Sequence, residues 1–486
     1  MPGHLVTRCV NQIFLKKVRD IADEGAEVDS KLTSGLPTSL PRRVQAERRL
    51  PLAWLGGAII LFAVLALYFK YVKVLDLSPH LWLAGVIAVG LLAWPRSRSA
   101  PMPLTQAVWI NNWLLAFGAY TAIHPLLPGV TLPPSNQNLL MTSFALCALL
   151  VSAVLLLAGP KAKRLLHALA FAIYAVGVAS AAALLLQVFV DFKLFDLATF
   201  TNELGFSDTG EVNLAVNNVT AAQIRGRGFL ESVHVYATSA AVSLVLGLYL
   251  RRSSKFAVAT LPVIIAALLV NWSMTAFAAL GIALIAWSGF FGRKHWDFNR
   301  VVMAFACVAV IGLVTLVFRG SLEEGLAGLM RYGPTDTMSS RISAWDRAIA
   351  MFLEHPLLGV GGGGYKILAG FYDGHFFPSR NPYFQQEAHS ILFQVLAQWG
   401  LIGAFLLGMH FRAALRMAMR ANSGLEKALA QAFVVVMLSA MMGNDILLFH
   451  PYFFSSVLLT LGAISQRERR IPAARAVATP PQLAAA

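Results

Sequence analysis

Twelve runs of apolar residues dominate the chain, and each is long enough, or nearly long enough, to cross a membrane. A transmembrane helix needs about 20 mainly apolar residues to cross the hydrocarbon core of a bilayer. Runs of this length restrict the fold, because in lipid only helices and closed barrels satisfy their own backbone hydrogen bonds. We therefore expect an all-α, polytopic integral membrane protein with about twelve transmembrane helices, near residues 52–69, 79–94, 104–123, 138–158, 165–189, 229–250, 256–270, 274–291, 300–318, 401–418, 427–443 and 446–465. For residues 256–291, a single broken helix is the alternative.

The charged residues are few, and their distribution predicts an orientation. Only 13% of the residues are charged, whereas about 25% is typical of soluble domains, so an ordinary soluble enzyme is excluded. Of the 39 Lys and Arg residues, 28 lie in the terminal segments or in connections on the N-terminal side. Cytoplasmic loops are enriched in Lys and Arg, so we expect both termini in the cytoplasm. The net charge of +15 is explained by this pattern and does not indicate a nucleic-acid partner.

Two of the expected extracytoplasmic connections are unusually long, and they divide the chain into segments. Loops longer than about 12–15 residues are uncommon unless they are functional or disordered. The expected segments are a cytoplasmic N-terminal segment at 1–51, nine transmembrane helices at 52–318 with an outer loop at 190–228, a large outer loop at 319–400, three helices at 401–465 and a disordered cytoplasmic tail at 466–486.

The two long outer loops contain most of the basic residues that lie outside the cytoplasmic set. These residues are Arg225, Arg227, Arg319, Arg331, Arg341, Arg347, Lys366 and Arg380. The guanidinium group is a planar fork that matches phosphate oxygens. As a group, these arginines indicate an anionic ligand on the outer face, and a diphosphate-linked lipid fits. For any single arginine, pairing with a loop carboxylate or a lipid headgroup remains the alternative.

The large outer loop contains a predicted helix. We expect this helix to start near Ser339, with Thr337 or a following serine as its N-cap. It should end near residues 354–356, because the residue before a proline disfavours the α conformation. Arg341 and Trp345 then share one face of the helix, since they are four residues apart.

A glycine-rich run, Gly359–Gly364, follows that helix and matches the pattern G-x-G-x-x-G. No strand precedes the run, and Gly364 is not followed by the Lys-Ser/Thr of a phosphate-binding loop. We interpret the run as close backbone packing against a helix or a sugar, and we reject the nucleotide-binding interpretation.

A histidine lies at the start of the next predicted helix. Apolar residues with helical spacing follow it at Ile391, Leu392, Val395, Leu396 and Trp399. This spacing places His389 in the first turn of a helix that enters the membrane from outside. A helix N-terminus favours the neutral imidazole, which a general base requires at neutral pH. The alternative is an interfacial histidine whose hydrogen bonds are satisfied.

Four short motifs occur in a fixed order around the large loop. They are Ser340-Arg341-x3-Trp345, Pro356-Leu357-Leu358-Gly359-Val360-Gly361, Glu387-Ala388-His389 and Gly400-Leu401-Ile402-Gly403. With this order and spacing the chain resembles the O-antigen ligase and O-antigen polymerase superfamily. These proteins are multispan glycosyltransferases of the bacterial inner membrane. The resemblance is strongest over 337–405 and weaker over Arg225-Gly226-Arg227-Gly228-Phe229.

The resemblance implies a GT-C-like fold and an inverting transfer of a glycan from undecaprenyl diphosphate to an acceptor hydroxyl. It implies an active site on the periplasmic side of the inner membrane, with His389 as the general base. Arg341 and one of Arg225 and Arg227 would bind the donor diphosphate. Possible supporting residues are Trp345, Glu387, Arg347 and Ser390. No cofactor is implied, and no metal, because the chain has no Asp-x-Asp motif and arginines would stabilise the leaving group instead.

The identity of the acceptor depends on finer features. Ser390 stands where the family usually has an asparagine, which bears on the polar groups around the base. Polymerases of the superfamily often have an Arg followed by Gly eleven residues later in their outer loops, and none of the outer-loop arginines named above has one. This favours a ligase with lipid A–core oligosaccharide as acceptor and membrane lipids as further partners.

Other functions are the alternatives to a ligase. Within the superfamily they are an O-antigen or exopolysaccharide polymerase and a protein O-oligosaccharyltransferase. A multispan transporter is less expected. Many transporters consist of two six-helix halves joined by a long central loop, whereas only five residues separate the sixth and seventh apolar runs here.

Overall fold

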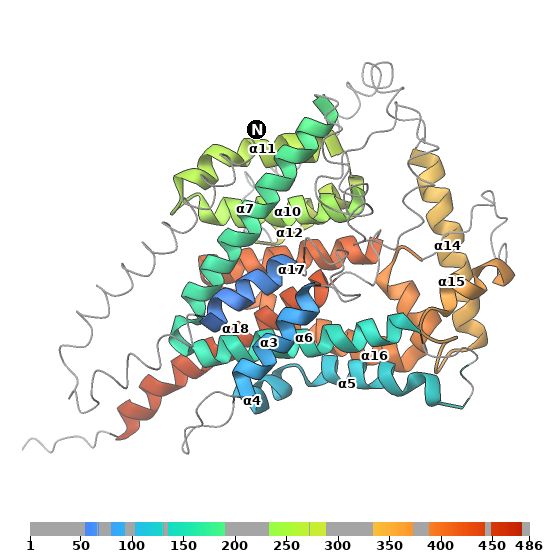
Figure 1. The fold of residues 1–486 in the computed structure, drawn as a ribbon, viewed down its shortest axis with the longest axis horizontal. Coiled ribbons are helices and arrows are strands. Elements are labelled where there is room, and N and C mark those ends of the chain that lie inside the picture. Colours follow the sequence, from blue (N-terminus) through green and yellow to red (C-terminus); the bar gives the residue numbers. More distant parts are fainter. Residues whose placement is uncertain are drawn as a thin grey trace, which may run out of the picture. The chain divides into compact units, whose positions relative to one another are not determined.

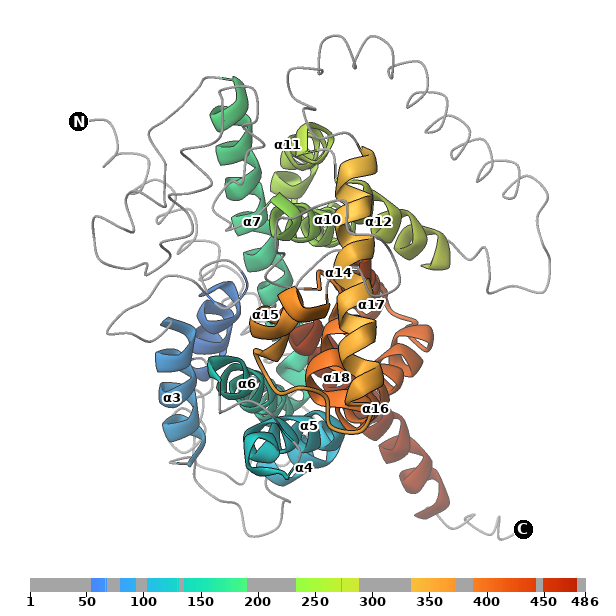
Figure 2. The same cartoon turned by 90° about the vertical axis from the view of Figure 1, so that its right-hand side faces the viewer.

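The computed structural model of the chain describes residues 54–65, 67, 79–92, 103–128, 130, 135–189, 233–271, 273–287, 334–372, 388–442 and 449–478. Contacts divide the chain into two compact units, 1–54 and 55–486, and all described residues except Trp54 belong to the second. Every secondary-structure element of the described residues is a helix (Figures 1 and 2). This confirms the all-α prediction.

Four of the described helices are long and apolar enough to cross a membrane. They are α6 (Asn136–Ala158), α7 (Ala162–Phe189), α16 (Ile391–Met419) and α17 (Gly424–Met442). Shorter apolar helices are Trp54–Leu65, α10 (Val233–Leu250), α11 (Lys255–Asn271) and α12 (Met274–Trp287). Helix α3 (Pro79–Leu92) also coincides with an expected span. The expected span at 300–318 lies outside the described residues, so the total of twelve is not confirmed.

Two expected boundaries differ from the structure. The expected span at 104–123 is two helices, α4 (Pro103–Ile110) and α5 (Asn112–Ile123). They are separated at buried Asn111, whose Nδ2 donates to the Ala107 carbonyl at 3.0 Å and to Ser152 Oγ at 2.8 Å. By contrast, α11 and α12 are separate helices, in agreement with the two spans expected within 256–291 rather than with the alternative of one broken helix.

The expected disordered tail is the second difference. Helix α18 (His450–Ala478) continues thirteen residues beyond the predicted end of the last span at 465, so 466–478 are helical. Glu468 on this extension accepts an ion-pair hydrogen bond from Lys163 Nζ at 2.7 Å.

Helix ends that the charge pattern assigns to one side of the membrane meet in the structure. On the expected cytoplasmic side, Ser465 Oγ donates to Glu426 Oε1 at 3.0 Å, in addition to the Lys163–Glu468 pair. Nε2 of His450, at the start of α18, lies 3.3 Å from Oγ of Ser239 in the second turn of α10. Each of these contacts is consistent with the predicted alternation.

The large outer loop is partly helical, as expected, and packs at the N-terminal end of α16. It contributes α14 (Pro334–Glu354), α15 (Gly364–Leu368) and the 3₁₀ turn η5 (Ala369–Tyr372). Both ribbon views place α14 and α15 beside the start of α16 (Figures 1 and 2). Helix α14 ends at Glu354 as predicted but begins at Pro334 rather than near Ser339, because proline is favoured at the first helical position.

Candidate active site

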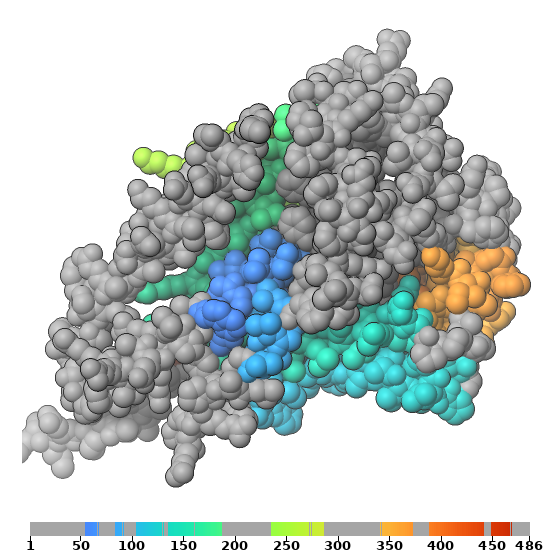
Figure 3. All heavy atoms as spheres, in the orientation of Figure 1, coloured from blue at the N-terminus to red at the C-terminus, as the bar shows by residue number. Residues whose placement is uncertain are grey.

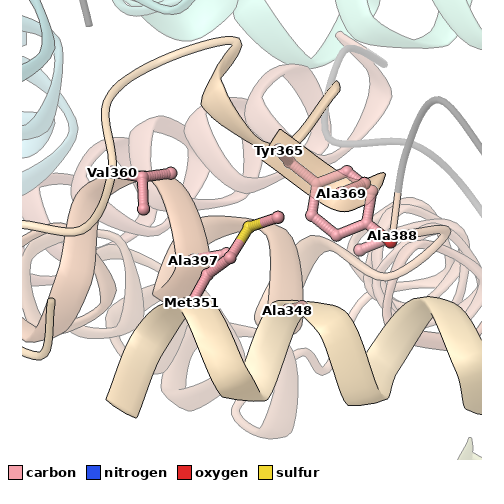
Figure 4. Packing of buried hydrophobic residues seen from close by; sticks show 7 residues of the cluster. All are labelled: Ala348, Met351, Val360, Tyr365, Ala369, Ala388 and Ala397. Atoms are coloured by element: carbon pink, nitrogen blue, oxygen red, sulfur yellow. The ribbon is translucent and has the colours of Figure 1, made fainter. Parts of the chain in front are cut away.

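A small hydrophobic cluster joins α14, the glycine-rich run, α15 and the start of α16 (Figure 4). Its buried members are Ala348, Met351, Val360, Tyr365, Ala369, Ala388 and Ala397. Tyr365 also donates its hydroxyl to the Ala344 carbonyl of α14 at 2.9 Å. Because Ala388 directly precedes His389, this cluster fixes the predicted base next to α14.

His389 lies just before α16 rather than in its first turn. The helix begins at Ile391, and Ser390 occupies the N-cap position with extended backbone angles, φ −154° and ψ 121°. The helix therefore starts at the first residue of its apolar pattern, and Ser390 makes no side-chain capping hydrogen bond. His389 itself is half-buried and has a positive φ of 47°.

The backbone conformation of His389 is strained and is held by its neighbours. A positive φ is uncommon for a residue other than glycine, although histidine is enriched there. Such a conformation costs on the order of 1–3 kcal/mol and persists only where the surroundings enforce it. Here the N–H of Ala388 donates to Oε1 of Gln394 at 3.0 Å, so the side chain of α16 reaches back over the turn. Residues in strained turns of this kind are concentrated at functional sites.

Arg341 lies in the second turn of α14 and contacts α12. It is half-buried, and its Nη1 donates to Oγ1 of Thr275, at the start of α12, at 3.3 Å. Burial lowers the pKa of the Arg341 guanidinium below its usual range. One turn further along α14, Trp345 packs against Phe393 of α16 with ring centroids 5.2 Å apart. Arg341 lies four residues, or about 6 Å of helix rise, before Trp345 on α14. His389 precedes Phe393 by four residues in the sequence, across the start of α16.

The predicted supporting residues on these helices are buried. Arg347 has 1% of its surface exposed and lies on a different face of α14 from Arg341, because six residues correspond to about 240° of rotation. It therefore does not extend the Arg341 face. Ser390, beside the base, also has 1% of its surface exposed.

Three predicted site residues, Arg225, Arg227 and Glu387, lie outside the described residues. Of the predicted site residues that the structure describes, Trp345 contacts Phe393 of α16, the helix that His389 and Ser390 precede, whereas Arg341 contacts Thr275 of α12.

The glycine-rich run packs against a break in α16. At Gly400 the backbone leaves the helical conformation, with φ 60° and ψ −160°. The chain at 356–361 supplies partners for the peptide groups on both sides of the break. The bonds run from Val360 N to Ala397 O (2.9 Å), Gly361 N to Gln398 O (3.0 Å), Leu401 N to Pro356 O (2.8 Å) and Ile402 N to Leu357 O (3.4 Å). We refer to residues 356–361 and 397–402 as the loop–helix junction.

Glycine is required on the loop side of this junction. Gly359 has a φ of 72°, and a Cβ atom there would lie 2.5 Å from the carbonyl carbon of Gln398. The structure thus shows that the run packs closely against a helix. Two motifs that are separate in the sequence, the proline–glycine stretch and the Gly400 stretch, form one backbone contact.

Two residues that sequence reasoning did not identify support the junction from α5 and the turn after it. His124 Nε2 lies 2.6 Å from the Leu358 carbonyl, and Tyr120 donates its hydroxyl to the Trp399 carbonyl at 3.1 Å. Figure 3 shows the surface of the α14–α15 segment, in orange, beside the cyan surface of α5 and α6. Neither residue belongs to a local motif, so only the tertiary contacts reveal them.

The assembled groups suit acid–base chemistry on an anionic substrate. A histidine in a fixed turn can accept a proton, and a half-buried guanidinium can stabilise negative charge. Among the described residues, no group of three His, Cys, Asp or Glu side chains is arranged to hold a metal ion.

Comparison with known proteins gives one family match. No curated protein matches the chain. Residues 259–408 match the family model described as O-antigen ligase. The matched range includes α12, α14, the loop–helix junction, Arg341 and His389. Residues 259–408 are therefore similar to the O-antigen ligase domain, and this match supports the O-antigen ligase superfamily for the chain.

Proposed function

We propose that the chain is an inverting, metal-independent glycosyltransferase that moves a glycan from undecaprenyl diphosphate to a sugar hydroxyl of lipid A–core oligosaccharide. The observation that carries the proposal is the strained turn at His389, which is packed against the helix that bears Arg341 within the family-matched range. The reaction takes place at the periplasmic face of the inner membrane, and both termini lie in the cytoplasm.

In the proposed reaction, His389 is the general base. Its imidazole removes the proton from the acceptor hydroxyl, and the resulting oxygen attacks the anomeric carbon of the donor sugar. The bond from that carbon to the diphosphate oxygen breaks, so undecaprenyl diphosphate leaves from the opposite face and the anomeric configuration inverts. The imidazolium then releases the proton to solvent. Because the leaving group is already activated, the site needs only a base and positive charge.

Arg341 supplies positive charge to the departing diphosphate. Its half-buried position supports this role, because electrostatic stabilisation is stronger where water is excluded. Its bond to Thr275 holds the side chain toward the start of α12. We assign the second diphosphate contact to Arg225 or Arg227. The arginines replace the divalent cation of metal-dependent sugar transferases, in keeping with the missing Asp-x-Asp motif.

A transfer assay with three acceptors tests the proposal. The purified chain is incubated with an undecaprenyl-diphosphate glycan and, separately, with lipid A–core, a second glycan-lipid and a pilin-like protein. We expect the glycan to be transferred to lipid A–core and undecaprenyl diphosphate to be released. NMR of the product should show that the anomeric configuration of the new linkage is inverted. Transfer to the second glycan-lipid or to the protein would assign a polymerase or a protein O-oligosaccharyltransferase instead. If no acceptor receives the glycan from the lipid diphosphate, the proposal is wrong.

A further inference from the structure

Helix α16 carries a row of buried polar side chains that begins directly beside His389. Ser390, Gln394 and Gln398 recur every four residues, so they lie along one face of the first two turns. Their exposed fractions are 1%, 0% and 0%. We call these three residues the polar row. It lies before the break at Gly400 and runs from the predicted base to the loop–helix junction.

Most of the hydrogen-bonding groups of the polar row have no partner. Within the part of the chain that the structure describes, Ser390 Oγ, Gln394 Nε2 and both side-chain polar atoms of Gln398 are buried without a hydrogen bond. Gln394 Oε1 alone is used, by the N–H of Ala388. Buried polar groups in proteins are normally paired, so several unpaired ones along one face need an explanation.

The chemistry of the row fits a neutral, hydroxyl-rich ligand. An amide both donates and accepts hydrogen bonds, and so does a serine hydroxyl. Sugar hydroxyls have the same dual character, whereas a diphosphate offers acceptors only and is better served by the charged Arg341 on α14. Trp345 adds one more unpaired donor, because its buried Nε1 also lacks a partner among the described residues.

We propose that Ser390, Gln394 and Gln398 form the subsite that binds the acceptor sugar and directs one of its hydroxyls to His389. This inference rests on the proposed function. A general base must lie within hydrogen-bond reach of the proton it removes, so the acceptor sugar has to bind next to His389, where the row begins. Because the polar row is almost fully buried, its side chains must become accessible before the acceptor sugar can bind to them.

The test is Gln398→Met in the purified chain. Replacing an unpaired buried amide by an apolar side chain of similar size removes no hydrogen bond from the fold, so Tm should stay the same or rise. The KM for lipid A–core should rise about threefold to tenfold for one lost hydrogen bond, with the donor KM unchanged. The control is Gln431→Met, at a half-buried glutamine of α17. This variant should change neither the acceptor KM nor the donor KM. Ser390→Ala is a second variant, because Ser390 makes no capping hydrogen bond that the substitution would remove. It should also raise the KM for lipid A–core.

A binding measurement keeps this test separate from that of the proposed function. Lipid A–core added without donor should raise the Tm of the wild-type chain, and Gln398→Met should reduce that shift. The subsite is overturned if Gln398→Met changes neither the KM for lipid A–core nor the Tm shift that lipid A–core produces. It is also overturned if Gln398→Met raises the KM for the donor and not that for the acceptor. The wild-type chain could also transfer no glycan and still show the rise in Tm with lipid A–core, with the rise lost in Gln398→Met. That result would contradict the proposed reaction but support the subsite.

Discussion

At the scale of single residues, the local conformation of His389 could not be read from the sequence. The motif Glu387-Ala388-His389 and the apolar spacing after it indicated a base at a helix start. They did not indicate a left-handed residue before the N-cap, because that conformation is imposed by contacts of Ala388 with Gln394 and with the hydrophobic cluster. His124 was missed for the same reason, since its partner is 234 residues away in the sequence.

Replacing Arg341 should weaken donor binding. Hydrogen bonds to charged groups contribute about 1.5–3 kcal/mol, so Arg341→Ala should raise the Kd for the undecaprenyl-diphosphate glycan by roughly tenfold to a hundredfold. The donor Kd of Arg341→Lys should lie between those of the wild-type chain and Arg341→Ala, because lysine keeps the charge but not the planar fork. Thr275→Val, which removes the hydroxyl partner of Arg341, is the control with a small effect. An unchanged donor Kd in Arg341→Ala would remove this arginine from the site.

Acid should destabilise the chain partly through His124. Burial lowers the pKa of His124 from its usual 6.5, although its hydrogen bond to Leu358 acts in the opposite direction. The unfolded chain therefore takes up this proton at a higher pH than the folded chain. The resulting stabilisation is complete above the unfolded pKa and is lost as the pH falls below it.

The variant His124→Gln isolates this contribution, because glutamine offers an N–H donor to Leu358 but does not titrate. Between about pH 7.5 and pH 5.5, its Tm should fall less than that of the wild-type chain. Equal losses in the two proteins would show that His124 does not contribute to the acid sensitivity.

At the scale of elements, the loop–helix junction explains why two of the sequence motifs occur together. The sequence showed that the glycine run fits close packing, but not which helix it meets. The break in α16 could not be predicted either, since its apolar pattern continues on both sides of Gly400. Only the structure shows that the peptide groups freed by the break are bonded to residues 356–361. The junction therefore couples residues 356–361 directly to α16, a helix that is long and apolar enough to cross a membrane.

Adding a side chain at Gly359 should disrupt this junction. Gly359→Ala puts a Cβ atom against the α16 backbone at a positive φ, so we expect a loss of about 2–4 kcal/mol of stability together with reduced transfer. Gly408→Ala is the matched control on α16, because a Cβ atom there meets nothing within 4 Å. That control should be neutral or stabilising by up to about 1 kcal/mol. Equal Tm values for the two variants, measured in the same detergent, would contradict the role of the junction.

At the scale of the whole molecule, composition and charge alternation were enough to predict a helical membrane protein. Outside residues 319–400, the described α-helices overlap the expected apolar runs, because a 20-residue apolar stretch has few other structures open to it. Boundaries were less predictable. The split at Asn111 depends on a bond to Ser152 of another helix, and the extension of α18 carries an ion pair with Lys163. Both depend on residues far away in the sequence.

Transfer by the intact enzyme should not require a divalent cation. If arginines neutralise the departing diphosphate, then treatment with a chelator, followed by assay in metal-free buffer, should leave the rate within about twofold of the untreated rate. A rate that falls with the chelator and returns on addition of magnesium or manganese would contradict the metal-independent mechanism.

The most direct test of the central claim is the transfer rate of His389→Asn in the purified system. Asparagine tolerates the left-handed conformation, so this variant removes the imidazole while keeping the turn, which His389→Ala does not ensure. We predict loss of transfer by at least about a hundredfold, with unchanged protein level, Tm and donor Kd. Transfer at a rate close to that of the wild-type chain would show that His389 is not the base.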